Sequence, residues 1–176
     1  MIIIKTKFKN LKLIKNKNFV DKRGLLREIY KKKVLKKNFI FDYFSISKKN
    51  VVRGLHFQFP QQEKIVTVLK GEILDFSLDL RKNSKTFLRF FKTKLSQENG
   101  TSIFIPKGFA HGFVTLKNEN IVLYNNSNYY KKDKEISIDF FDKNIKMLEF
   151  SKRYFRSNKD KNALTINQFE KKFKSL

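Results

Sequence analysis

Between Val51 and Phe141 the chain consists of short runs of β-branched and aromatic residues separated by turn signals, a pattern typical of β-strands. In the clearest run, residues 73–80, apolar and polar positions alternate. The apolar residues Leu74, Phe76, Leu78 and Leu80 share one face, and Asp75, Ser77 and Asp79 share the other. Because the polar face is so regular, we expect it to line a cavity rather than to face bulk water. The other runs cover residues 64–69, 86–95, 102–105, 112–116, 121–124 and 136–141.

The close spacing of these runs predicts an all-β sandwich or barrel, and we expect a jelly-roll barrel. Proline occurs only twice, glycine only six times and no long period repeats, so nothing marks a linker or a solenoid. At 176 residues the chain has the size of one domain, and we expect a single domain over residues 1–176. Short peripheral helices are expected at 28–37 and at 167–176, where Phe169 and Phe173 stand four apart.

The composition is that of a chain that folds around a hydrophobic core. Hydrophobic residues make up 40% of the sequence and aromatic residues 15%, which excludes a disordered tail. Cysteine is absent, which excludes a disulfide scaffold, a zinc ribbon and a thiol nucleophile. No stretch approaches the roughly 20 apolar residues of a membrane span, and the apolar N-terminal run is too short for a secretory signal. We therefore expect a soluble cytoplasmic protein with no membrane partner.

The charge is strongly positive, with 40 Lys and Arg residues against 16 Asp and Glu residues and a formal net charge of +24. One hypothesis is a module that binds nucleic acid or another polyanion. However, lysines are spread in pairs and triplets, such as 31–33 and 171–172, without one dense basic block. We favour a general compositional bias, because Phe, Ile and Asn are abundant beside Lys, and we expect no nucleic-acid partner. A positive surface would still steer an anionic, phosphate-bearing substrate toward the protein.

The two histidines of the chain are candidates for chemistry. His56 lies in Val51-Val-Arg-Gly-Leu-His-Phe-Gln58 and His111 in Ile105-Pro-Lys-Gly-Phe-Ala-His-Gly-Phe113. A structural role for each is the plain alternative. A metal site of two histidines and one carboxylate would need a third ligand. The His-X-His pair of metal-binding members of this barrel class is missing, because Gln58 stands where the second histidine would be, so we expect no metal.

Seven motifs in register carry a specific resemblance over nearly the whole chain. They are Asp21-Lys-Arg-Gly24 with Glu28; Val52-Arg-Gly-Leu-His-Phe-Gln58; Lys64 and Gly71-Glu72 ahead of Asp79-Leu-Arg81; Leu95-Ser with Asn99; Ile105-Pro-Lys-Gly-Phe-Ala-His-Gly-Phe113; Leu123-Tyr124 with Asn128-Tyr-Tyr130 and Glu135; and Ser157-Asn-Lys-Asp160. In these motifs the chain resembles the dTDP-4-dehydrorhamnose 3,5-epimerase family, which is a cupin jelly roll of deoxysugar biosynthesis. The resemblance implies a cupin-type barrel with short peripheral helices.

The chemistry of that family sets physical requirements that can be compared with the residues present. A ketone at C4 acidifies the C–H bonds at C3 and C5, because the carbanion is delocalised as an enolate. Inversion then needs a base on one face, an acid on the other and a stabilising group at the enolate oxygen. Histidine, with an ordinary pKa of about 6.5, suits the base. By resemblance, His56 is the base, Asp160 its partner, Lys64 the group at the enolate oxygen and Tyr124 the acid.

The resemblance also implies which residues bind the substrate. They are Arg23, Glu28, Ser45, Arg53, His111, Tyr130, Glu135 and Lys159, with Tyr130 beside the nucleotide base. Arginine is the natural bidentate partner of a diphosphate. The chain departs from the family where relatives read Gln-X-Asn-X-Ser, because the segment here is Phe41-Asp-Tyr-Phe-Ser45 and keeps only the serine. This exchange of two amides for aromatic residues bears on which nucleotide and which sugar are bound.

These inferences favour a cofactor-free epimerase that inverts C3, C5 or both on a nucleotide-linked 4-keto-6-deoxyhexose or 4-keto-heptose, for bacterial surface polysaccharides. The resemblance further implies a homodimer in which the N-terminal strand crosses to the partner and supplies Arg23 and Glu28 to its site. A nucleotide-sugar 3,4-ketoisomerase and a non-catalytic sugar-nucleotide-binding cupin remain as alternatives. The first would move the carbonyl, and the second would bind substrate without exchanging protons.

Overall fold

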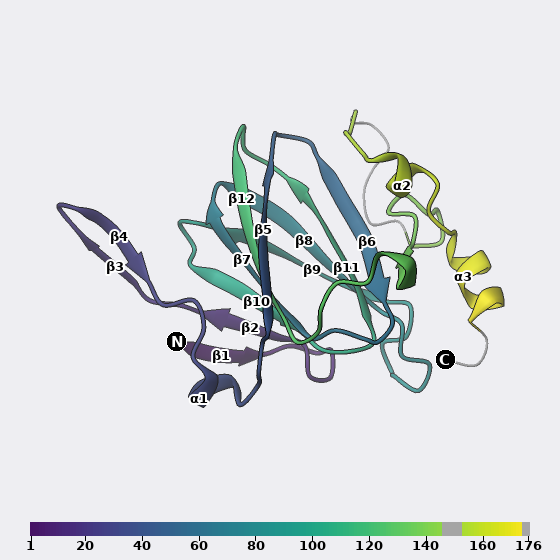
Figure 1. Cartoon of the computed structure of the whole chain (residues 1–176), viewed down its shortest axis with the longest axis horizontal. Helices are drawn as coiled ribbons and strands as arrows, with labels where there is room; N and C mark the ends of the chain where they lie inside the picture. The colour runs from purple at the N-terminus through teal and green to yellow at the C-terminus, as the bar shows by residue number, and fades with distance from the viewer. Residues whose placement is uncertain (146–152, 174–176) are drawn as a thin grey trace.

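The computed structural model describes residues 1–145 and 153–173 and contains two facing antiparallel β-sheets (Figure 1). The six-stranded sheet has the order β1 (Ile2–Lys5), β2 (Lys12–Lys15), β10 (Thr101–Ile105), β7 (Lys64–Lys70), β12 (Asn120–Asn126) and β5 (Phe41–Ser47). The five-stranded sheet has the order β13 (Glu135–Ser137), β6 (Val52–Gln58), β11 (Phe109–Thr115), β8 (Glu72–Asp79) and β9 (Phe90–Ser96). The predicted all-β, cupin-type jelly roll is therefore confirmed.

A separate hairpin of β3 (Asn18–Asp21) and β4 (Gly24–Arg27) projects from the barrel. In Figure 1 it extends to one side, while the C-terminal helices α2 (Asn158–Lys161) and α3 (Ile166–Lys172) lie at the opposite side, near β6. The remaining helical turns are α1 (Lys32–Leu35) and the 3-10 turn η1 (Lys132–Lys134). Among the described residues, none of the helices has the length and hydropathy that a membrane span requires.

Two layers of apolar side chains hold the five-stranded sheet in place. Between the sheets, Ile73 and Phe113 are fully buried and pack with Val66 and Val122 of the opposite sheet. On the outer face, Phe76 packs with Phe140, Ile166 and Phe169 of the C-terminal segment, among others. A capping box between Thr165 and Gln168 fixes the start of α3. The apolar face of β8 thus packs against the C-terminal segment, as its alternating pattern predicts, and Ile73 adds an apolar contact on the inner face.

The polar face of β8 does point between the sheets, as predicted from its alternation. Asp75, Ser77 and Asp79 have no exposed surface. They do not form the wall of the cavity themselves, however. Asp75 lies behind that wall and bonds to His111, which does line the cavity. Asp79 instead binds Arg81, Ser84 and Thr86 and so fixes the loop after the strand.

Several predicted element boundaries were too wide. The helix expected at 28–37 shrinks to α1, because Lys36 takes a left-handed conformation (φ 53°) and ends it after Leu35. The strand expected from 86 begins only at Phe90, since Thr86 is held by the Asp79 carboxylate. The strand expected at 136–141 ends at Ser137, after which Phe140 turns into the outer apolar core. The helix expected at 167–176 is α3, and residues 174–176 lie outside the described part of the chain.

Candidate active site

A cavity of about 600 Å³ lies between the two sheets. Strands β6 and β11 form one wall, β5, β7 and β12 form the other, and residues 155–160 contribute to the rim. Of the residues that the sequence suggested for the site, those that line the cavity are Ser45, Arg53, His56, Lys64, His111, Tyr124, Tyr130, Glu135, Lys159 and Asp160. The structure therefore brings most of the proposed site residues to one cavity.

A β-bulge in β6 turns two of these side chains into the same cavity. His56 pairs with His111, and Arg53 pairs with Phe113, so three steps along β6 match two steps along β11. Residues three apart point to opposite faces in a regular strand, but the extra residue brings both to one face. Gly54 makes the bulge, with φ +117° and an approach to β11 so close that a Cβ would lie 2.5 Å from the Cα of Gly112.

His56 and Asp160 form a hydrogen-bonded pair in the cavity wall, with 2.7 Å between Nε2 and Oδ1. Ser157 caps α2 and donates its hydroxyl to the other oxygen of Asp160 at 2.9 Å. Burial by itself would raise the pKa of the Asp160 carboxyl, but His56, Ser157 and the charge of Lys159 outweigh it and hold the pKa below 3.8. A charged carboxylate thus orients the imidazole and leaves its other nitrogen to accept a proton.

Glu135 links the histidine to the rim of the cavity. Its Oε1 atom lies 3.6 Å from Nδ1 of His56. Its Oε2 atom accepts a hydrogen bond of 2.7 Å from the Tyr130 hydroxyl and pairs with the ammonium of Lys159. One carboxylate therefore positions two of the side chains that the family resemblance assigned to substrate binding, one of which, Tyr130, it placed beside the nucleotide base.

Lys64, Asp75 and His111 form a charged group at the inner end of the cavity. Nε2 of His111 lies 2.7 Å from Oδ2 of Asp75, and both side chains are buried. Burial lowers the pKa of Lys64 to about 8, and the attraction of Asp75 opposes that fall. Lys64 shares its face of β7 with the buried Val66 and Val68, as the alternation in the sequence predicts.

Tyr124 reaches the cavity from the six-stranded sheet, whereas His56 reaches it from the five-stranded sheet. The side chain is 6% exposed and shares its face of β12 with Val122. Burial raises the pKa of the Tyr124 phenol, and the neighbouring Tyr43 adds to that rise. The hydroxyl therefore stays protonated at neutral pH, as a proton donor must.

Two polar side chains at the β5 side complete the wall. Arg53 donates from Nε to the Ser47 hydroxyl at 2.9 Å, which anchors its guanidinium beside β5. The Ser45 hydroxyl is buried beside the Tyr124 phenol, and its hydrogen bonding opposes the rise that burial causes in the pKa of that phenol. Ser45 also lines the cavity, so it is a candidate to bind a polar group of the substrate next to Tyr124.

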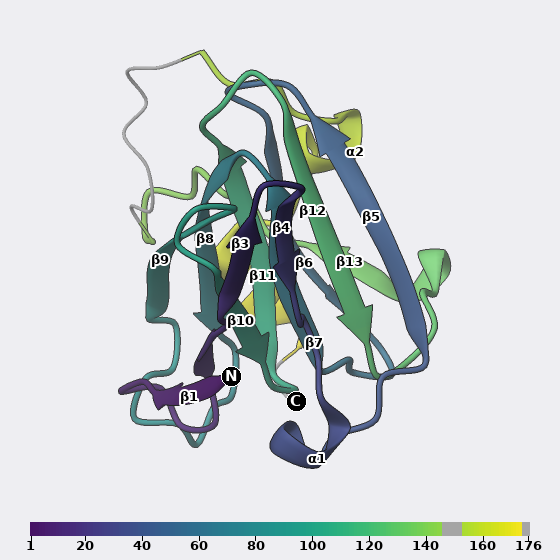
Figure 2. The ribbon, with the colours of Figure 1, turned by 90° about the vertical axis from the view of Figure 1, so that its left-hand side faces the viewer.

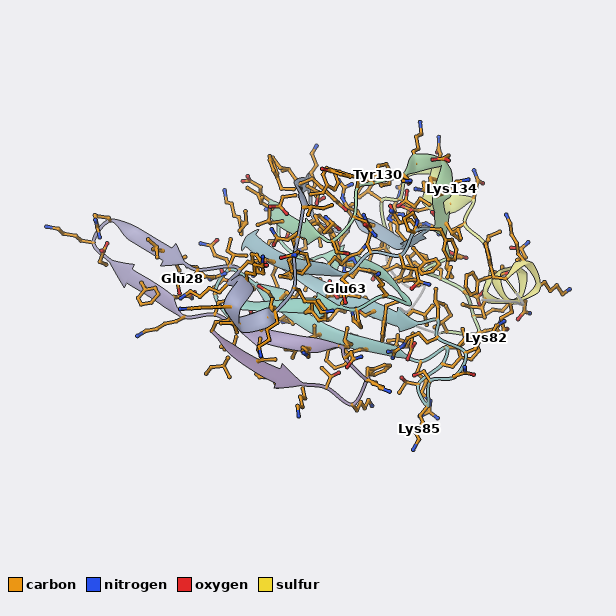
Figure 3. The ribbon with its side chains drawn as sticks, turned by 60° about the horizontal axis from the view of Figure 1, so that its bottom comes forward. Glu28, Glu63, Lys82, Lys85, Tyr130 and Lys134 are labelled. Carbon is orange, nitrogen blue, oxygen red and sulfur yellow. The ribbon has the colours of Figure 1, made fainter. Side chains whose placement is uncertain are left out.

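Arg23 and Glu28 lie outside the cavity of their own chain. Arg23 pairs with Asp21 at 2.6 Å, and Glu28 pairs with Lys31 at 2.6 Å, in largely exposed positions. Figure 3 shows Glu28 at the base of the projecting hairpin, on the other side of the molecule from Tyr130. Because β3 and β4 lead the chain away from the barrel, this segment cannot reach its own site.

Sequence reasoning missed several residues of the site, and two of them bear directly on its chemistry. Asp75 was recognised as part of a polar strand face but not as the partner of His111, because nothing local links β8 to β11. Tyr43 was noted only as a departure from the family pattern, yet it lines the cavity and stacks on Tyr124. Within residues 1–145 and 153–173, no three His, Cys, Asp or Glu side chains are placed to hold a metal ion.

The jelly roll brings a histidine, a lysine and a tyrosine to one cavity, a set of groups that suits an enzyme that moves protons at carbon. The family model described as dTDP-4-dehydrorhamnose 3,5-epimerase matches residues 5–168. The chain belongs to this epimerase family. It is 42% identical over 153 residues to the dTDP-4-dehydrorhamnose 3,5-epimerase of Salmonella typhimurium, covering 82% of this chain and 84% of the relative.

A second relative and a solved structure support the same family assignment. The dTDP-4-dehydrorhamnose 3,5-epimerase of Methanothermobacter thermautotrophicus is 38% identical over 168 residues, which cover 90% of this chain and 91% of that protein. The dTDP-6-deoxy-D-glucose-3,5-epimerase of Legionella pneumophila, solved in complex with dTDP-4-keto-L-rhamnose, superimposes with a TM-score of 0.91 at 35% identity. That match covers 97% of this chain and 95% of the Legionella protein.

Proposed function

We propose that the chain inverts both C3 and C5 of a dTDP-linked 4-keto-6-deoxyhexose through enolate intermediates. The observation that carries this proposal is the position of the His56–Asp160 pair and of Tyr124, which line one cavity from opposite sheets. Inversion needs an acid and a base on opposite faces of one sugar ring. A site that only bound the sugar would need neither group.

In the first half of the reaction, His56 removes the proton from the carbon next to the ketone. The electron pair of the broken C–H bond moves into the C–C bond to the carbonyl carbon, and negative charge develops on the ketone oxygen. The Asp160 carboxylate stabilises the imidazolium that forms. The buried ammonium of Lys64 stabilises the developing oxyanion, where low polarity makes its charge more effective.

In the second half, Tyr124 donates its phenolic proton to the opposite face of the same carbon. The enolate electrons form the new C–H bond and the ketone is restored. The phenolate then regains a proton from solvent, and the His56 imidazolium releases its proton to solvent. Since C3 and C5 both flank C4, the same groups serve both centres when the ring is suitably placed. His111, held by Asp75 beside Lys64, is available to hydrogen-bond the sugar oxygens.

The rim of the cavity carries the groups that suit a nucleoside diphosphate. Arg53 and Lys159 offer positive charge for the phosphates, and the exposed ring of Tyr130 offers a face for the base. The Legionella relative was solved with dTDP-4-keto-L-rhamnose, which supports a thymidine nucleotide here. Phe41 and Tyr43 stand in the same wall as additional aromatic surfaces.

We further propose that the protein is a homodimer and acts in the cytoplasm, since a charged sugar nucleotide does not cross a membrane unaided. The β3–β4 hairpin exposes Val20 by 71% and Leu26 by 64%, although a two-stranded hairpin alone is marginally stable. Phe44 and Ile46 on β5 are also more than half exposed. Docking the hairpin on a second copy would cover such surfaces and carry Arg23 and Glu28 toward the partner's cavity.

The direct test is to incubate the protein with dTDP-4-keto-6-deoxyglucose in D2O and to follow the sugar by NMR. We expect deuterium at C3 and C5 together with inversion at both carbons. A carbonyl that migrates to C3 would identify a ketoisomerase instead. Binding without deuterium incorporation would identify a non-catalytic binding protein.

A further inference from the structure

The rings of Tyr43 and Tyr124 stack, with centroids 4.5 Å apart and planes 18° apart. The two residues face each other directly across the pairing of β5 and β12, which lie side by side in Figure 2. Aromatic pairs of this geometry stabilise by about 0.5–1.5 kcal/mol beyond the area they bury. The stack therefore fixes the ring of the proposed acid against a neighbour on the edge strand.

The two rings are not equivalent. Tyr124 is 6% exposed, whereas Tyr43 is 40% exposed, so Tyr43 forms the outer layer of the stack. On other sides the ring of Tyr124 meets Phe113 at 6.4 Å and the edge of His111 at 6.4 Å. Tyr43 therefore covers one face of the Tyr124 ring and itself lines the cavity.

Further aromatic side chains support Tyr43 in turn. Its ring centroid lies 5.5 Å from that of Phe41, which lies 5.8 Å from that of Tyr129. Because β5 is the edge strand of its sheet, these contacts replace the support that a further strand would give. An asparagine, which the family resemblance would place at this position, could not stack in this way.

We propose that Tyr43 is a positioning residue for inversion: its ring holds the Tyr124 phenol toward the sugar and keeps water away from it. The inference rests on the proposed function and adds a residue to it. Tyr43 takes no proton itself. Without its ring, Tyr124 could turn or meet water, and the enolate would more often regain a proton on the face from which His56 removed it. When the proton returns to the original face, the carbon exchanges its hydrogen with solvent but keeps its configuration.

The test compares deuterium incorporation with inversion in D2O for three variants. Tyr43→Ala should exchange at a rate within about threefold of the unaltered protein but invert at least about tenfold more slowly, since a small misplacement of a reacting group costs that much. Tyr43→Phe keeps the ring and should invert within about twofold. As a control, Tyr30→Ala removes another aromatic contact, the perpendicular one with Phe39, whose residues do not line the cavity, and should leave the ratio of exchange to inversion unchanged.

An equal fall of exchange and inversion in Tyr43→Ala, or a normal ratio, would overturn the inference. Failure of the proposed function would look different, because the unaltered protein would then exchange no deuterium at all. A second measurement needs no turnover: 19F NMR of 3-fluorotyrosine-labelled protein, with Tyr124→Phe to assign the signal. The H2O-to-D2O shift of that signal should be small in the unaltered protein and in Tyr43→Phe, and larger in Tyr43→Ala. An unchanged shift in Tyr43→Ala would contradict the shielding role.

Discussion

His56 and Asp160 stand 104 residues apart in the chain, yet Nε2 of the imidazole lies 2.7 Å from Oδ1 of the carboxylate. We predict that Asp160→Asn, which keeps the shape of the side chain but removes its charge, lowers the rate of deuterium exchange about 100- to 1,000-fold. The KM should change little, because Asp160 stabilises the charged form of His56, which develops only in the transition state and not when the substrate binds. A raised KM with an unchanged kcat would contradict this role.

Lys64 makes the reaction sensitive to alkaline pH. Its pKa is lowered to about 8 by burial, so the ammonium loses its proton as the pH rises through this value. We predict that kcat/KM, which follows the protonation of the free enzyme, falls above about pH 8, since the neutral amine stabilises an oxyanion poorly. Asp75→Asn removes the charge that opposes the lowering of the Lys64 pKa, so in this variant the decline should begin at a lower pH. If activity declines at the same pH in Asp75→Asn as in the unaltered protein, Lys64 is not the group that causes the decline.

The same shift predicts an effect on stability. The unfolded chain binds the Lys64 proton more tightly than the folded chain, so this group lowers stability most below about pH 8, and the free energy of unfolding rises toward pH 10.5. A shift of this size corresponds to about 3 kcal/mol. Lys64→Met should therefore be inactive yet unfold at a higher temperature at pH 7, with the difference shrinking as the pH rises. Thermal unfolding of both proteins from pH 7 to pH 10 tests this expectation.

Gly54 sets the direction of His56. We predict that Gly54→Ala lowers the free energy of unfolding by about 3 kcal/mol or more and abolishes activity, because φ is +117° and the new Cβ would collide with the backbone of Gly112. Gly24→Ala is a matched control, since its φ is +128° but nothing lies within 4 Å of its Cβ. It should cost only the backbone strain, about 1–2 kcal/mol. Equal losses in denaturant unfolding of the two variants would contradict the close approach of β6 and β11.

The hairpin provides a test of assembly. We predict that Leu26→Glu yields monomers with weak activity, because its side chain is 64% exposed in the single chain and would be covered by a partner. Arg23→Ala should leave the dimer intact and raise KM. Lys85→Glu, at the exposed position labelled in Figure 3, controls for added negative charge and should change neither. Sedimentation equilibrium measures the oligomeric state of each variant, and steady-state kinetics measures its activity. A fully active Leu26→Glu monomer would contradict the proposal that one copy supplies residues to the site of its partner.

Alternation along single strands could be predicted from the sequence, because it depends only on neighbouring residues. The two faces of β8 follow from the two-residue period of a strand, and so does the sharing of one face by Tyr124 and Val122, although the period alone does not say which face points inward. The pairing of His56 with Asp160 could not be predicted in this way, because residues so far apart in the sequence carry no local signal. That pairing was expected from the family resemblance alone.

Other features escaped prediction because they break the regular pattern. Arg53 and His56 are three apart and would point to opposite faces without the bulge, for which Gly54 was the only signal. Strand β1 carries an unbroken apolar run, and the β3–β4 hairpin exposes apolar residues, so neither alternates as a half-buried strand does. The stack of Tyr43 on Tyr124 depends on the pairing of β5 with β12, which no local pattern predicts.

The central claim is that His56 removes a proton from carbon and that Tyr124 returns one to the opposite face. It is tested most directly by NMR of the 4-keto substrate in D2O with two variants. His56→Ala should lose deuterium exchange by at least about 100-fold, while Tyr124→Phe should still exchange but fail to invert. Exchange at the original rate in His56→Ala would contradict the account.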